Sequence, residues 1–365
     1  MLSNEYLLSV IAVRKIYMDC CFVVTHLVSD GINFVNCVSK ISKQVYLIPK
    51  GSGTNIGMEK LASNVTLLKT SKNEFFLGEI GLLEALQTII KNKKFVIFDM
   101  GGYFTKLICE KLIPTSNLSC VIEDTENGHQ KYLKAIKRSD PRNFPIYSVA
   151  RSPLKSPEDY LVGQAIVFSA EKYLRNKNEL LACKKALVIG YGKIGSSIAY
   201  TLRTRGVMVY VCDTDYLKIV IAQAQSFRTV QKNEIINQVD LIFSATGNCA
   251  LTLKDFEKNK RTCYVFTATS SDDEFCTQLS RQLNCQNKAL LHYEKRIRNA
   301  VFPNLGNPIN FKDGAVVGGF IQLVQAEMIH ISRFYKRLNF YEGISELSNS
   351  RRRYIAKKWV ERYHE

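Results

Sequence analysis

A glycine-rich turn between two apolar segments dominates the middle of the chain. Residues 186–189 and 208–212 are short apolar runs, each typical of a buried strand. Between them, Gly190, Gly192 and Gly195 follow the G-x-G-x-x-G spacing. Apolar residues recur at helical spacing after the last glycine. The segment therefore predicts a strand, a tight turn, a helix and a second strand, in the order that dinucleotide-binding folds use.

Each glycine has a separate physical task in such a turn. Gly190 permits the tight bend, Gly192 lets a pyrophosphate approach the backbone, and Gly195 lets the helix pack closely on the strand. Lys193 and Ile194 open the helix, whose N-terminal amides and dipole point at the phosphates. All five residues are therefore predicted to hold the cofactor.

An acidic residue completes the pattern. Asp213 follows the second strand, about 20 residues after the glycines, where a carboxylate takes the ribose hydroxyls. It would repel a 2′-phosphate, so the sequence predicts NAD rather than NADP. The alternative is that the glycines form only a tight turn.

Composition bounds the class of protein. The chain has 365 residues, 46% hydrophobic and 23% charged, which is ordinary for a globular protein of two domains. No apolar run is long enough to span a membrane. Eleven cysteines without a C-x-x-C pair favour reduced thiols in a cytoplasmic protein, and no metal site is predicted.

The net charge of +17 raises the question of nucleic-acid binding. The lysines are spread along the chain, and we find no recognisable nucleic-acid-binding motif. Arg351, Arg352 and Arg353 with Lys357 and Lys358 form the strongest basic cluster, typical of a solvated helix. Nucleic acid is therefore not the expected partner.

Strand and helix patterns alternate along the chain, which predicts α/β architecture with parallel sheets. We expect two doubly wound domains, a Rossmann NAD-binding domain and a substrate domain, with a cleft between them. The substrate domain is predicted at 1–165, completed by about 313–345, the NAD-binding domain at 166–312, and a basic C-terminal tail at 346–365. An apolar helix is expected from about 315 to 338.

Several segments, in order, resemble the adenosylhomocysteinase (S-adenosylhomocysteine hydrolase) family. Besides the glycine turn, the similar segments are Asp99-Met100-Gly101-Gly102, Glu123-Asp124-Thr125, Lys155 to Gly163, Ala245-Thr246-Gly247 and Asn304-Leu305-Gly306. The resemblance covers roughly residues 95–330 and, more faintly, 20–60.

The resemblance implies that a tightly held NAD oxidises the 3′-hydroxyl of a nucleoside-like substrate, with elimination and water addition at C5′. Lys155 corresponds to the base, Asp159 and Asp124 to positioning groups, and His26 to a histidine near the 5′ leaving group. It further implies that Thr125, Thr246, Gly247 and Asn304 contact the cofactor, and that the protein forms homo-oligomers.

Other positions depart from the family pattern. Met100, Tyr160, Ser270 and Phe311 stand where the family has other residues of the site. Losing one positioned acid–base group costs about 10²–10⁴ in rate. The sequence therefore favours a divergent NAD-dependent enzyme that oxidises a ribose or another secondary alcohol, with or without hydrolysis. A catalytically impaired NAD-binding sensor or scaffold protein is the alternative.

Each catalytic candidate also has a purely structural interpretation. Lys155 would by default be a surface lysine, and His26 a structural histidine at a strand end. Asp159 suits the first turn of a helix, and Asp124 an Asx turn.

Overall fold

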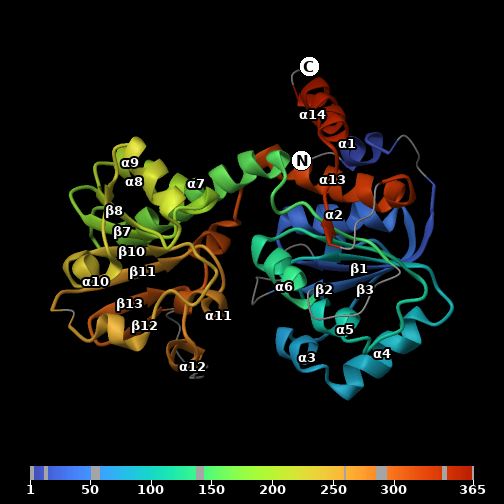
Figure 1. The fold of residues 1–365 in the computed structure, drawn as a ribbon, viewed down its shortest axis with the longest axis horizontal. Helices are drawn as coiled ribbons and strands as arrows, with labels where there is room; N and C mark the ends of the chain where they lie inside the picture. Colours follow the sequence, from blue (N-terminus) through green and yellow to red (C-terminus); the bar gives the residue numbers. More distant parts are fainter. Residues whose placement is uncertain are drawn as a thin grey trace. The chain divides into compact units, whose positions relative to one another are not determined.

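The computed structural model divides into two compact units, Met1–Ser156 with Gly318–Glu365, and Pro157–Val317. The residues described are 4–11, 15–50, 58–136, 144–258, 260–284, 294–338 and 343–363. Each unit contains one seven-stranded sheet within these residues (Figure 1). The α/β fold class predicted from the sequence is confirmed.

The sheet of the first unit is parallel throughout, in the order β14-β6-β5-β4-β1-β2-β3. Its strands are β1 (Met18–Thr25), β2 (Ser42–Pro49), β3 (Val65–Leu67), β4 (Phe95–Asp99), β5 (Leu118–Glu123), β6 (Ile146–Ser148) and β14 (Ile344–Ser345). The order reverses between β1 and β4, as in doubly wound sheets. Ligands of such folds bind beyond the carboxyl ends of the strands at this point.

Helices cover both faces of this sheet. One group packs on the face that receives Cys21 and Val23, and consists of α1 (Asn4–Ser9), α2 (Ser29–Ser39), α13 (Ile321–Phe334) and α14 (Asn349–Tyr363). The other group packs on the face that receives Phe22, and consists of α3 (Lys72–Leu77), α4 (Ile80–Ile90), α5 (Thr105–Cys109) and α6 (Glu126–Ile136). Successive β1 side chains thus enter opposite cores, which explains why the strand is apolar without alternation.

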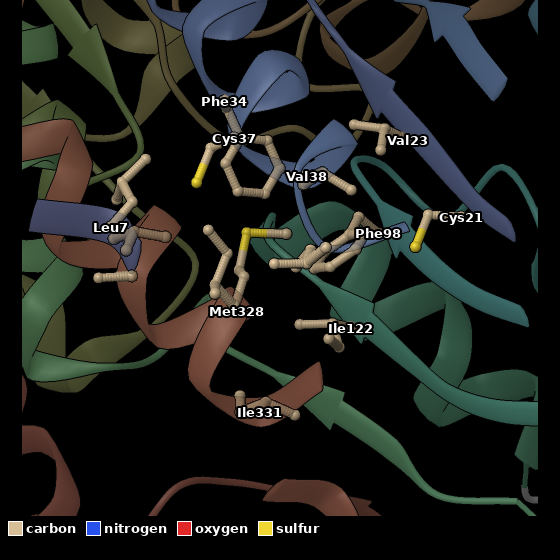
Figure 2. Packing of buried hydrophobic residues seen from close by; sticks show 14 of the residues in the cluster. Leu7, Cys21, Val23, Phe34, Cys37, Val38, Phe98, Ile122, Met328 and Ile331 are labelled. Atoms are coloured by element: carbon tan, nitrogen blue, oxygen red, sulfur yellow. The ribbon is translucent and has the colours of Figure 1, made fainter. Parts of the chain in front are cut away.

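Figure 2 shows the first of these cores. Phe34 and Val38 of α2 lie beside Val23 and Phe98 of the sheet, with Met328 of α13 close to them. Phe34 meets Phe98 edge to face, with the ring centroids 5.6 Å apart. Residues from both ends of the chain therefore share one core.

The second unit has the order β12-β13-β11-β10-β7-β8-β9, parallel except for β12 against β13. Its strands are β7 (Lys185–Ile189), β8 (Met208–Cys212), β9 (Arg228–Thr229), β10 (Leu241–Ser244), β11 (Cys263–Thr267), β12 (Glu294–Ile297) and β13 (Ala300–Pro303). Its helices are α8 (Lys193–Thr204), α9 (Tyr216–Ala224), α10 (Lys232–Ile235), α11 (Ser271–Glu274) and α12 (Thr277–Asn284), and α7 (Ser156–Arg175) leads into it. Read in the opposite direction, the order β9-β8-β7-β10-β11-β13 is the strand order of the Rossmann fold.

The helix predicted from 315 to 338 is shorter than expected. Helix α13 begins only at Ile321, because Gly314 and Gly318 adopt left-handed φ values of 81° and 64° that end helical geometry. The segment 346–365, predicted as a basic tail, contains α14 and lies within the first unit. No helix of the described ranges combines the length and the apolar character that a bilayer crossing requires.

Candidate functional site

The glycine turn of the second unit lies between β7 and α8. Gly190 has a left-handed φ of 91°. A Cβ on Gly195 would lie 1.9 Å from the carbonyl oxygen of Gly190, so only glycine lets α8 start this close to the strand. A Cβ on Gly192 would meet nothing within 4 Å, and no side chain caps α8 at this end. Open space therefore lies above uncapped helix amides, as a pyrophosphate requires.

Asp213 lies next to this turn. Its Oδ2 accepts a hydrogen bond of 2.5 Å from the backbone N–H of Tyr191, and its Oδ1 accepts one of 2.9 Å from the backbone N–H of Asp215. The carboxylate at the end of β8 thus faces the glycine turn at the end of β7. Together, the open turn and the carboxylate fit the diphosphate and ribose of a dinucleotide.

A buried glutamate organises the loop after β10, where Thr246 and Gly247 lie. Glu274 has no exposed surface. Its carboxylate accepts hydrogen bonds from the backbone N–H groups of Thr246 and Gly247, at 3.0 and 2.9 Å. The hydroxyl groups of Ser244, Thr246 and Thr269 donate to it as well. Sequence reasoning missed Glu274, because no motif near it indicates this role.

Asn304 lies in a strained loop after β13. Asn304, Leu305 and Gly306 all have positive φ values, between 52° and 78°. The Asn304 side chain donates a hydrogen bond of 3.0 Å to the carbonyl oxygen of Pro308. Asn304 therefore holds its own loop in shape.

In the first unit, polar residues gather at the carboxyl ends of the parallel strands. His26 follows β1, Lys50 follows β2, and Gly101 lies in the turn after β4. The Nζ of Lys50 lies 3.1 Å from the position of a Cβ on Gly101. Burial, and after it the charge of Lys50, lowers the pKa of His26 to about 3, so the imidazole is neutral at physiological pH. Sequence reasoning did not single out Lys50, although its place directly after a strand was a signal.

Asp124 and Lys155 form a buried ion pair at the same edge. Asp124 follows β5, and Lys155 ends the short 3-10 helix Pro153–Lys155. The Lys155 Nζ lies 2.9 Å from Asp124 Oδ1, and the two residues are 8% and 7% exposed. The interpretation of Lys155 as a surface lysine is therefore wrong. Ion pairs this buried are rare unless both groups have a task or strong partners.

Asp159 lies in the first turn of α7 and is 7% exposed. Its Oδ2 is 3.3 Å from the Nζ of Lys193, the first residue of α8. Gly163, one turn later, packs against Ser197 of the same helix. Asp159 thus connects α7 with the start of the helix that follows the glycine turn.

The predicted cofactor residue Thr125 belongs to the first unit. Its backbone N–H and its hydroxyl both donate to Glu123 Oε1 at 2.7 Å. Glu123 also accepts from the N–H groups of Gly101 and Gly102. Thr125 therefore helps to hold the turn after β4.

The departures from the family pattern have different surroundings. Met100 packs partly against the apolar core on the α3–α6 face, whereas Tyr160 is 44% exposed. The hydroxyl of Ser270 donates to Asp273 at 2.6 Å, and Phe311 is half-buried in the 3-10 helix Ile309–Asp313.

Residues 168–315, which include the glycine turn, Asp213, Glu274 and Asn304, match the family described as S-adenosyl-L-homocysteine hydrolase, NAD binding domain. This part of the chain is similar to the NAD-binding domain of adenosylhomocysteinases. The resemblance predicted from the ordered motifs is confirmed for these residues, which lie within the second unit.

A relative and two solved structures define how far this similarity extends. An adenosylhomocysteinase of Thermoplasma volcanium is 26% identical over 267 residues, which cover 69% of this chain and 64% of that protein. A D-3-phosphoglycerate dehydrogenase oxidoreductase of Ralstonia solanacearum has a TM-score of 0.50 at 12% identity, and covers 91% of this chain and 97% of its own. A phosphoglycerate oxidoreductase of Vibrio cholerae has a TM-score of 0.47 at 13% identity, with 84% and 98% covered. The first solved structure supports the two-domain α/β fold alone.

Proposed function

We propose that this protein is an NAD-dependent enzyme that oxidises a ribose or another secondary alcohol of a nucleoside-like substrate. The observation that carries the proposal is the buried Asp124–Lys155 ion pair, held by a chain whose other unit is an NAD-binding domain. NAD, when bound, takes up the hydride that the alcohol loses on oxidation. The diphosphate would lie on the amides that follow Gly192, and Asp213 would bind a ribose of the cofactor.

Lys155 is the proposed general base for the hydroxyl proton. The carboxylate of Asp124 favours the ammonium form of Lys155, because an opposite charge stabilises the charged state. A substrate hydroxyl that takes over the carboxylate of Asp124 would remove this stabilisation. The ammonium group of Lys155 would then lose its proton to solvent and, as a neutral amine, accept the proton of the hydroxyl that is oxidised. In this proposal Asp124 is both the substrate-binding group and the partner that keeps the lysine charged until substrate arrives.

A role for His26 follows from its charge state. As a neutral imidazole beside Lys50, it can accept one hydrogen bond and donate another without bringing a second positive charge to the strand ends. We propose that it contacts the 5′ side of the substrate. Asp159 would support the start of α8 through Lys193.

A second candidate is a catalytically impaired NAD-binding sensor or scaffold of the same fold. Met100 and Phe311 favour this second candidate. Each stands where the family has another residue of its site, and neither side chain can donate or accept a proton. Hydrolysis at C5′ is part of the first proposal, the enzyme, and not of the second. Self-association and a cytoplasmic location remain predictions.

One experiment distinguishes the candidates. The purified protein is denatured and the released nucleotide identified by mass spectrometry. The intact holoprotein is then incubated with adenosine, adenosylhomocysteine and other nucleosides, while the absorbance of reduced nicotinamide is recorded. We expect partial reduction with at least one nucleoside. Release of NAD without any reduction across the panel would favour the sensor.

Substitutions at the ion pair test the assignment. Lys155→Met should slow reduction by about 10²- to 10⁴-fold, the usual cost of a lost general base. Because this change leaves Asp124 buried without its partner, Lys155→Met combined with Asp124→Asn serves as a neutral pair. Lys134→Met, at an exposed lysine of the same unit, is the matched control and should reduce NAD as the wild type does.

A further inference from the structure

Two cysteines lie beside the loop that Glu274 organises. Cys249 follows Gly247 by two residues, and Cys276 follows Glu274 by two residues. The backbone N–H of Cys249 donates to the carbonyl oxygen of Asp273 at 2.8 Å, and that of Cys276 donates to Leu251 at 2.9 Å. The two segments therefore run side by side, and an isolated parallel bridge joins them.

The thiol of each cysteine reaches the backbone of the segment that carries the other cysteine. The Sγ of Cys276 donates to the carbonyl oxygen of Cys249 at 3.3 Å, and the Sγ of Cys249 donates to that of Phe275 at 3.5 Å. The two cysteines therefore lie close together on adjacent segments, and a disulfide requires such proximity.

Exposure separates this pair from most other described cysteines. Cys249 is exposed and Cys276 half-buried, whereas the thiols in the strands and in α2 are buried in the apolar cores. The buried ones are Cys20, Cys21, Cys37, Cys120, Cys212 and Cys263. Cys249 also has a left-handed φ of 47°, which a side chain with a Cβ rarely adopts. Because Cys249 is exposed and Cys276 is partly exposed, a small oxidant can reach the pair.

We propose that Cys249 and Cys276 form a reversible dithiol–disulfide pair, a redox modification site beside the Thr246–Gly247 loop. The oxidant is a low-molecular-weight disulfide. One protein thiolate attacks it and releases one small thiol, which leaves a mixed disulfide on the protein. The second protein thiolate then displaces the second small thiol. In total, two protein thiols lose two electrons and two protons, and one small disulfide becomes two small thiols.

The pair is coupled to the proposed cofactor site through Glu274. A bond between the two sulfur atoms would join the segment after Gly247 to the segment after Glu274, whose carboxylate already holds both loop amides. The oxidised loop would have fewer open conformations. We therefore expect oxidation to slow the release of bound NAD, an effect that rests on the proposed function, whereas the disulfide itself does not.

The test uses the full-length holoprotein and oxidised glutathione. Remaining thiols are alkylated, and the cross-links are mapped by peptide mass spectrometry before and after treatment with dithiothreitol. Wild type and Cys183→Ser, a change at another exposed cysteine, should both form the Cys249–Cys276 bond reversibly. Cys249→Ser and Cys276→Ser should retain one glutathione adduct instead. Failure to form the bond in the folded protein, or a bond to any other cysteine, would overturn the proposal.

A second measurement tests the coupling. NAD release is followed from oxidised and reduced wild type, and from Cys249→Ser under both conditions. Slower release from oxidised wild type alone supports the coupling. Equal release from both forms of a protein with the mapped disulfide would overturn the coupling and leave the modification site standing. Absence of bound NAD would contradict the proposed function, while the cross-link map would still decide the disulfide.

Discussion

Glu123 and Asp99 are fully buried carboxylates that together hold the turn after β4. Glu123 accepts from the amides of Gly101 and Gly102, and Asp99 accepts from Tyr103, from Phe104 and from the hydroxyl of Tyr132. Burial, and after it the charge of Asp99, raises the pKa of Glu123 from 4.5 to about 7. Burial raises the pKa of Asp99 as well.

This environment predicts a pH dependence of stability. Between pH 4.5 and about 7 the folded protein holds a proton on Glu123 that the unfolded chain has lost. The contribution of Glu123 to the free energy of unfolding should therefore be full below pH 4.5 and decline as the pH rises to about 7. Urea unfolding at several pH values measures it.

The control is Glu123→Gln, which cannot titrate. His26 contributes the opposite slope, because burial lowers its pKa from 6.5 to about 3. The difference between wild type and variant therefore removes the contribution of His26, reports Glu123 together with its interaction with Asp99, and should shrink as the pH rises. A difference independent of pH would contradict the assignment.

At the scale of elements, helix α14 connects the C-terminal segment to the proposed catalytic turn. Arg352 donates from Nε to Glu327 Oε1 of α13 at 2.8 Å, and Glu327 Oε2 accepts from the hydroxyl of Ser152 at 2.5 Å. Ser152 in turn accepts from the N–H of Leu154 and caps the short helix that ends at Lys155. A buried chain of polar contacts thus runs from α14 to the short helix that ends at Lys155, the proposed base.

Removing the arginine should destabilise the first unit. Arg352→Ala leaves Glu327, which has no exposed surface, without its charged partner, and breaking a buried pair costs about 3–5 kcal/mol. Arg353→Ala, at the adjacent exposed position, should stay within about 0.5 kcal/mol of wild type. Chemical denaturation of both variants measures the costs. Equal stability of the two would show that the pair contributes nothing.

At the scale of the whole molecule, each unit has its own sheet and its own apolar cores. A ligand that binds one folded unit stabilises that unit by mass action. NAD at 100 times its Kd should add about 2.7 kcal/mol to the stability of the unit that binds it. Calorimetry of protein first freed of nucleotide should show a higher unfolding temperature after NAD is added than before.

Gly192→Ala separates binding from folding in this measurement. The new methyl group meets no protein atom within 4 Å, and the φ of −75° suits alanine, so the variant should unfold near the wild-type temperature without NAD. The methyl group occupies the space that a pyrophosphate needs, so the shift caused by NAD should disappear. A full shift in the variant would place the dinucleotide elsewhere.

The amino-acid sequence by itself determined the local parts of this protein. The strands are continuous apolar runs because both sheet faces are covered, so β7, β8, β10 and β11 could be predicted from composition. The glycine turn and Asp213 lie within one strand–helix–strand segment, where spacing along the chain controls spacing in space. Periodicity failed before α13, where the left-handed conformations of Gly314 and Gly318 delay the start of the helix to Ile321.

Only the tertiary structure decided which distant side chains meet. Asp124 and Lys155 are 31 residues apart, and Glu274 reaches a loop 27 to 30 residues away. Cys249 and Cys276 adjoin only because their segments pair. In a parallel sheet the carboxyl ends of the strands share one edge. The strand order then decides which of these ends, and which side chains on them, lie next to each other. No local pattern encodes that order, because it results from the packing of whole helices and strands around shared cores.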